Sequence, residues 1–279
     1  MARYTRLWMA SGVFSLFGAM LLHLLVLAGN GGVWNGFVHL TLFGWITGFI
    51  FAVNYHTLPV FTTRTFPYPR LIVVHWLLFN LGILAATLGL LWHNALGYRL
   101  GIGLEGASSL LFTLNVLLLF VRGQKRGQRQ PTSAEQRNVD RLSTYATKAA
   151  GLGLPLALGL LNAVEYRWLN PRWHLAAEHA ATLGWVMLMI IGVAAHVLPR
   201  WTGRPFRQVW RLRLALVCHN LALVLMIPAL GLGWQPLFRI GGGVMALALG
   251  LFGWLIWPNL RQSASTPILI MPTVRSKIK

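Results

Sequence analysis

Residues 37–59, FVHLTLFGWITGFIFAVNYHTLP, decide the fold of this chain. The stretch contains no Asp, Glu, Lys or Arg. It is also longer than the about 20 mostly apolar residues that a helix needs to cross a bilayer. It therefore predicts a transmembrane helix, with His39 near one end and His56 near the other.

Seven more stretches of this kind lie along the 279 residues. The chain is 56% hydrophobic and 10% charged, whereas soluble domains carry about 25% charged residues. Lipid must therefore be its main solvent, and we predict an all-α integral membrane protein with eight transmembrane helices. The expected ranges are 7–28, 37–59, 71–92, 100–121, 143–164, 174–198, 213–233 and 240–260.

The basic residues give the predicted orientation. A net charge of +19 would suggest nucleic acid for a soluble protein, but here the charges lie between apolar stretches. Contact with anionic lipid headgroups accounts for them, and we expect no nucleic-acid partner. Twenty of the 24 Lys and Arg residues lie at the termini or within 60–70, 122–148 and 199–213, whereas only Arg99, Arg167, Arg172 and Arg239 lie on the other side. The positive-inside rule then predicts a multi-pass protein of the inner membrane with both termini in the cytoplasm.

The stretch 37–59 has a counterpart at 177–199, AEHAATLGWVMLMIIGVAAHVLP. Both contain a His, a Gly-Trp pair and a final His-x-Leu-Pro. Each of these features in the second stretch lies as far from its counterpart in the first as His179 lies from His39. Such paired landmarks predict an internal duplication. Four helices per unit give the two copies the same orientation, related by an axis along the membrane normal. The expected parts are a first repeat at 1–121, a basic cytoplasmic linker at 122–142, a second repeat at 143–260 and a cytoplasmic tail at 261–279.

Histidines recur at matching positions inside these helices, where a buried polar side chain is costly and usually marks a site. His39 and His179 are expected at the outer ends of the second and sixth helices, and His56 and His196 at the inner ends. Seventeen residues of helix rise about 25 Å, so the two pairs form separate layers. Neutral imidazole suits haem iron, copper and zinc, and we regard all four histidines as candidate metal ligands.

The outer pair predicts a b-type haem. Two imidazoles from facing helices suit a six-coordinate haem, and no Cys-x-x-Cys-His sequence exists for covalent attachment. We therefore predict one haem between the second and sixth helices, coordinated by His39 and His179. Gly44 and Gly184, little more than one turn further along, would leave room for a flat ring or a close helix.

The inner layer is a second candidate site. His75 matches His219 if an insertion of four residues is allowed, and both are expected to join His56 and His196. This set would hold a second haem or a copper ion, and the sequence leaves the pairing open.

Four charged residues complete the candidate sites. Arg99 and Arg239 are repeat-equivalent candidates for binding haem propionates, with contact to lipid headgroups as the alternative. Glu105, inside the fourth helix, and Glu178, beside His179, are each candidates to relay protons or to hold a ligand histidine by its second nitrogen. The alternative for both is a neutral carboxylic acid near the outer interface, or one paired with Arg99 or Arg172.

The segment that begins at His39, and its partner from His179 to Arg204, resemble the NnrS family and the small relatives of the catalytic subunit of haem-copper oxidases. In both groups a helix opens with His, continues with Phe/Leu-Gly-Phe/Trp and ends near Pro with Trp-Thr or a basic residue, like WTGR at 201–204. The resemblance covers under a quarter of the chain. It implies haem, and also copper, in respiration or nitric-oxide chemistry. The large families have twelve helices, and the oxidase subunit has an adjacent His-His pair that is missing here, so we expect no complete oxygen reductase.

Three functions stay open at this level. The leading one is a b-type haem protein in respiratory electron transfer or the nitric-oxide response, working as an oxidoreductase with a quinol or another redox partner. The alternative is a transporter for a metal ion or small solute, which parallel repeats also suit. The third is an assembly subunit, including a homo-oligomer, in which the histidines are structural.

Overall fold

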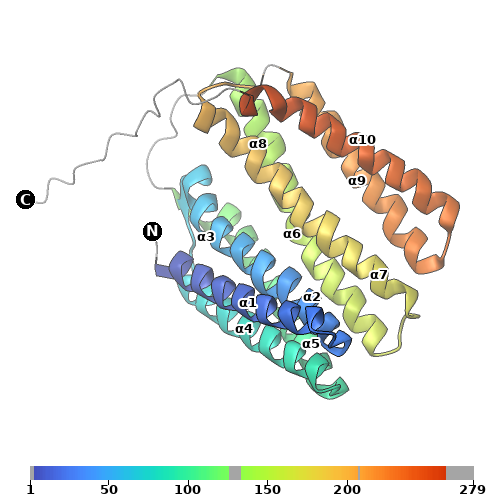
Figure 1. Ribbon diagram of the computed structural model, residues 1–279. Helices are drawn as coiled ribbons and strands as arrows, with labels where there is room; N and C mark the ends of the chain where they lie inside the picture. Colours follow the sequence, from blue (N-terminus) through green and yellow to red (C-terminus); the bar gives the residue numbers. More distant parts are fainter. Residues whose placement is uncertain (1–2, 126–132, 207, 262–279) are drawn as a thin grey trace, which may run out of the picture.

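The computed structural model describes residues 3–125, 133–206 and 208–261 (Figure 1). This part of the chain has eight helices that are long and apolar enough to cross a membrane, which confirms the predicted fold class. The spans are Arg3–Leu27 (α1), Gly31–Thr62, Pro69–Leu91 (α4), Ala95–Arg122 (α5), Ala134–Glu165 (α6), Arg172–Thr202, Val209–Leu232 (α9) and Gln235–Leu260 (α10).

The second and sixth spans are interrupted in the same way. The second consists of η1 (Gly31–Val33), α2 (Trp34–His39), the π-helical η2 (Leu40–Thr47) and α3 (Gly48–Thr62). The sixth consists of α7 (Arg172–His179), the π-helical η3 (Ala180–Met187) and α8 (Leu188–Thr202). Each π-helix begins directly after a candidate histidine, and π-helical turns are rare and often lie at functional sites.

The backbone repeats with the same offset as the sequence. The π-helices, the helices that follow them and their left-handed C-caps all keep the offset between His39 and His179, with φ 51° at Thr63 and φ 67° at Gly203. The starts of α4 and α9 also keep it. No insertion therefore separates these helices, and His75 corresponds to Ala215 rather than to His219 as the sequence analysis predicted.

The fifth span begins earlier than expected. Ser133 caps α6 by accepting a hydrogen bond from the backbone N–H of Gln136 at 3.1 Å, and Glu135 adds a favourable negative charge to the first turn. The predicted linker at 122–142 is therefore partly helical, and its residues 126–132 lie outside the described residues. The predicted tail also lies outside them, apart from Arg261.

The two groups of four spans lie side by side (Figure 1). Equivalent helices make the same contacts in the two halves. In the first, α4 packs on α5 and α1 on η2; in the second, α9 packs on α10 and α6 on η3. The halves meet where α5 packs on α6 and η2 on η3. Trp8, Phe51, Phe112 and Trp185 belong to one buried core that extends through both halves.

The two ends of the bundle differ in charge. One end carries the turn at 63–68, the residues 203–206 after α8 and the last residues of α5 and α10. These segments contain Arg64, Arg122 and Arg204, and we call this end the basic face. A two-residue ladder also lies there, pairing β1 (Arg64–Thr65) with β2 (Gln124–Lys125). The opposite face carries the turns at 92–94 and 166–171. An even number of spans places both ends of the described chain at the basic face (Figure 1).

Candidate functional site

A buried histidine and a buried carboxylate form the centre of the candidate site. His39 Nε2 lies 2.9 Å from Glu105 Oε1, and the two side chains are 5% and 1% exposed. His39 is the last residue of α2, and Glu105 lies on the buried side of α5. The structure thus pairs the membrane-embedded carboxyl that the sequence singled out with one of the predicted ligands.

His39 also forms part of the wall of a pocket of about 670 Å³ on the opposite face. This volume is typical of small-molecule sites, which range from about 300 to 1,000 Å³. Trp34 and Phe43 of the second span and Leu90 at the end of α4 provide apolar surface. The pocket therefore offers one imidazole beside aromatic and aliphatic walls.

The same pocket gathers acidic and histidine side chains. It is lined by Glu165 from the end of α6, by Glu178 and His174 from α7, and by His93 from the turn after α4. Together with Glu105, which bonds to His39, this is three of the five acidic residues in the chain. Among the described lining residues there is no Lys or Arg. The pocket is therefore acidic in a chain whose net charge is +19.

His93 and His174 were missed by the sequence analysis. Both lie at the ends of apolar stretches, on the same side of the membrane as His39. Their common position near the same membrane face as His39 was the sequence feature that could have indicated them. The sequence does not reveal that the turn after α4 and the start of α7 border one pocket.

His179 does not face His39, contrary to the prediction. The His39 ring stands edge-on to Tyr98 at 6.1 Å, and the His179 ring stands edge-on to Phe238 at 5.9 Å. Tyr98 and Phe238 occupy equivalent positions in the two repeats, so each histidine faces the fourth helix of its own repeat. His179 Nδ1–H donates to Leu175 O at 2.9 Å, within its own helix.

The reason for the difference lies on the fourth helices. Glu105 provides a carboxylate partner for His39, whereas the corresponding position in the second repeat is Met245. The contact between the second and sixth spans is occupied by other side chains. Trp185 Nε1 donates to Thr47 Oγ1 at 3.1 Å, and the Trp185 ring packs 5.5 Å from that of Phe51.

The predicted glycines serve close helix packing. A Cβ atom at Gly44 would lie 2.9 Å from Ser15 of α1. Gly184 has the backbone of Gly153 in α6 against it, and a Cβ atom at Gly153 would lie 2.5 Å from the Gly184 carbonyl. Of the two uses left open by the sequence, a flat ring or a close helix, the structure shows the close helix.

The four inner histidines do not come together, because each meets different neighbours. His56 is exposed on α3. His75 is fully buried, and a 2.8 Å hydrogen bond joins its Nδ1 to the Tyr55 hydroxyl. His219 Nε2–H donates to Leu183 O at 3.0 Å. Within the described ranges, no group of three His, Cys, Asp or Glu residues is arranged to hold a metal ion.

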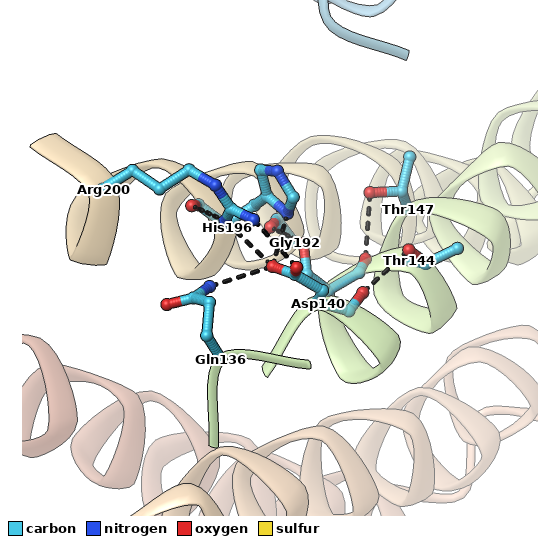
Figure 2. Close-up of polar contacts among 8 residues, drawn as sticks. Gln136, Asp140, Thr144, Thr147, Gly192, His196 and Arg200 are labelled. Carbon is cyan, nitrogen blue, oxygen red and sulfur yellow. Dashed lines mark hydrogen bonds and ion pairs between the residues drawn. The ribbon is translucent and has the colours of Figure 1, made fainter. Parts of the chain in front are cut away.

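His196 belongs to a cluster around Asp140 near the basic face (Figure 2). The Asp140 carboxylate accepts a two-pronged bond from Arg200 at 2.9 and 2.8 Å, and lies 3.0 Å from His196 Nδ1. Gln136 donates to the same carboxylate at 2.9 Å. The cluster joins α6 to α8. The sequence analysis missed Asp140 because it falls within the predicted linker.

The two predicted arginines lie away from the pocket. The Arg99 guanidinium is 5.7 Å from the ring of Tyr166, and Arg239 is exposed on α10. Neither lines the pocket beside His39. Contact with the interface is therefore the better account of both.

A haem held between His39 and His179 does not fit this arrangement, since the two rings face different helices. The surroundings of His39 do fit one axial ligand, because a carboxylate bonds one ring nitrogen and the residue lines a pocket with apolar walls. Neither a scan against models of protein families nor a search of curated proteins finds a match to this chain.

Proposed function

We propose that the chain is a b-type haem-binding membrane protein with His39 as an axial ligand. The hydrogen bond between His39 Nε2 and Glu105 Oε1, at 2.9 Å and out of contact with solvent, is the observation that supports it. Metal-ligating histidines almost always give their other ring N–H to such a partner, which fixes the tautomer and the ring orientation. Glu105 is thus a positioning residue for the ligand.

The pocket supplies the rest of the proposed site. Trp34, Leu42 and Phe43 form apolar surface beside His39. His93 and His174 line the same pocket and are the candidates for a second imidazole. A bound haem supplies a one-electron couple or a place for a diatomic gas. The proposal includes no copper, because the inner histidines have separate partners.

The resemblance to the NnrS family suggests the process. On this proposal the protein acts in respiratory electron transfer or in the response to nitric oxide, with a quinol or a redox protein as its partner. The pocket opens at the face opposite the basic loops, which the positive-inside rule places outside the cytoplasm.

A transporter for a metal ion is the second candidate, favoured by the charge of the same pocket. Glu165 and Glu178 give the pocket a negative charge that attracts divalent cations, although the described residues are not arranged as a metal-binding group. Carboxylates there also repel the propionates of a haem, and no basic residue is among the described lining residues. A pair of parallel four-helix units suits a transporter as well.

Absorption spectroscopy with metal analysis of the purified full-length chain separates the two. The haem proposal expects a Soret band and equal amounts of iron and haem. His39→Ala should remove the haem or change its spectrum, whereas His179→Ala, the matched change in the other repeat, should leave the spectrum intact. A colourless protein without iron contradicts the haem proposal. Uptake of Zn²⁺ or Mn²⁺ into vesicles containing the protein, abolished by Glu178→Gln, would then support transport.

A further inference from the structure

A second pocket, of about 700 Å³, lies at the basic face between residues 204–206, the start of α9 and the end of α10. Two arginines, Arg204 and Arg211, line it together with Gln208 and Asn259. Phe206, Leu255 and Pro258 give it an apolar side. No acidic residue is among the described lining residues, so the pocket is positively charged and half apolar.

Arg211 is held in place without having its charge neutralised. Its guanidinium carbon lies 3.4 Å from the ring centroid of Trp254 and 5.6 Å from that of Trp210. Cation–π contacts of this kind orient an arginine and leave its N–H groups for an anion. The Nε atom of Arg211 is buried and has no hydrogen-bond partner among the described residues. None of these contacts neutralises the positive charge of Arg211.

The start of α9 adds to the positive potential. Gln208 is the N-cap residue of this 24-residue helix, and its side chain makes no capping hydrogen bond. The first backbone N–H groups of a long helix carry partial positive charge and bind phosphate readily. Asn259 of α10 holds the end of α8 and the residue after it, because it donates to Thr202 Oγ1 at 2.9 Å and to Arg204 O at 3.1 Å.

The first repeat has no comparable arrangement at the matching place. Leu71 occupies the position of Arg211, and Leu119 that of Asn259. Arg64, which corresponds to Arg204, donates to the backbone carbonyl of Phe120. In the first repeat the arginine therefore bonds to the protein backbone. In the second repeat two arginines, Arg204 and Arg211, line an open pocket.

We propose that this pocket binds the phosphate group of an anionic phospholipid. Basic pockets between helices at the cytoplasmic end of membrane proteins bind such headgroups. Trp254 and Trp257 are half exposed on α10, and tryptophans of this kind mark the headgroup level of a bilayer. Phe206, Leu255 and Pro258 would contact the start of the acyl chains, a surface that a free phosphate ion does not need.

Thermal unfolding of the full-length protein in detergent tests the proposal with three probes. These are dioctanoyl phosphatidylglycerol, dioctanoyl phosphatidylcholine and inorganic phosphate. We expect phosphatidylglycerol to raise the unfolding midpoint at concentrations where the other two have little effect. Each of Arg204→Gln and Arg211→Gln should weaken the apparent affinity for phosphatidylglycerol about fivefold, since each removes one basic residue near the surface. Arg211→Lys should retain more of the affinity than Arg211→Gln.

The matched control removes the same charge from the same face. Arg70 and Arg213 are exposed near the starts of α4 and α9 and do not line the pocket. The variant Arg70→Gln/Arg213→Gln should keep the midpoint shift that Arg204→Gln/Arg211→Gln loses. Equal losses in the two double variants would overturn the proposal, because general attraction to the basic face would then explain binding. Equal protection by inorganic phosphate or by phosphatidylcholine would overturn the assignment to an anionic lipid.

Discussion

The indole Nε1 of Trp185 donates a 3.1 Å hydrogen bond to Thr47 Oγ1, which joins the π-helices of the two repeats. Trp185 is fully buried at this contact. Trp185→Phe removes the bond and also leaves unfilled space at a fully buried site, so its total cost exceeds that of the bond. For the bond itself we expect a coupling energy of about 0.6 kcal/mol, the average for hydrogen bonds between helices in membranes. A double-mutant cycle with Thr47→Val, measured by unfolding in mixed detergent, checks this. A coupling energy of zero would contradict it.

The close approach of α6 to the sixth span depends on Gly153. A Cβ atom there would lie 2.5 Å from backbone atoms of Gly184, which cannot move away as a flexible side chain can. We expect Gly153→Ala to destabilise the protein by about 1–3 kcal/mol, the usual cost of overpacking. Gly159, on the same helix, has open space where a Cβ atom would lie, with no atom within 4 Å. Gly159→Ala is therefore the control and should leave the unfolding midpoint unchanged or slightly raised.

Glu105→Gln tests the positioning of His39. The amide keeps the shape of the side chain and loses the charge, so the bond to the His39 ring is weaker. If haem is bound there, we expect its affinity to fall about 10–100-fold, as for other partners of metal-ligating histidines. Haem titration of the depleted protein gives this affinity. An unchanged affinity together with an unchanged spectrum would show that Glu105 does not act on the ligand.

Asp140→Asn should loosen the contact between α6 and α8. The change removes the charge that Arg200 and His196 both contact, and hydrogen bonds to charged groups contribute about 1.5–3 kcal/mol. Glu135, an exposed acid on the same helix, provides the control. Glu135→Gln removes only the charge in the first turn and should lower the unfolding free energy by less than about 1 kcal/mol. Similar effects of the two variants would rule out a special role for the cluster.

Orientation is tested by reporter fusions. A reporter after residue 131 or after residue 261 should report the cytoplasm, and one after residue 168 the other side. The asymmetric distribution of the 24 Lys and Arg residues is the reason for this expectation. A cytoplasmic signal only at residue 168 would reverse the orientation.

The number and approximate position of the spans could be predicted because apolar length is a local property of the sequence. The ends were harder to place, since caps decide them. Ser133 starts α6 about two turns before the apolar stretch begins, and the second span continues past Pro59 to Thr62. The constant offset between the two repeats was visible in side chains and recurs in the backbone.

The partners of the histidines could not be predicted in the same way. Counting at 3.6 residues per turn assumes a regular α-helix, and a π-helix follows both His39 and His179. Which side chain faces a histidine also depends on other helices, as Glu105 and Met245 show for the two repeats. Asp140 could not be predicted, because its partners His196 and Arg200 come from a helix about 60 residues further along the chain. No local sequence pattern marks such a carboxylate.

The π-helices at matching places in the two halves bear on the predicted duplication. If the halves arose by duplication of a four-span unit, an irregularity that both contain would have been present in that unit, which would have assembled as a symmetric dimer. In such a dimer every contact occurs twice, with the roles of the partners exchanged. The contact of Trp185 with Thr47 has no such mirror image today, because the partner that Trp45 would need is Met187, which has no hydroxyl. The contact between the two π-helices is therefore asymmetric in this chain, whatever symmetry the backbone retains.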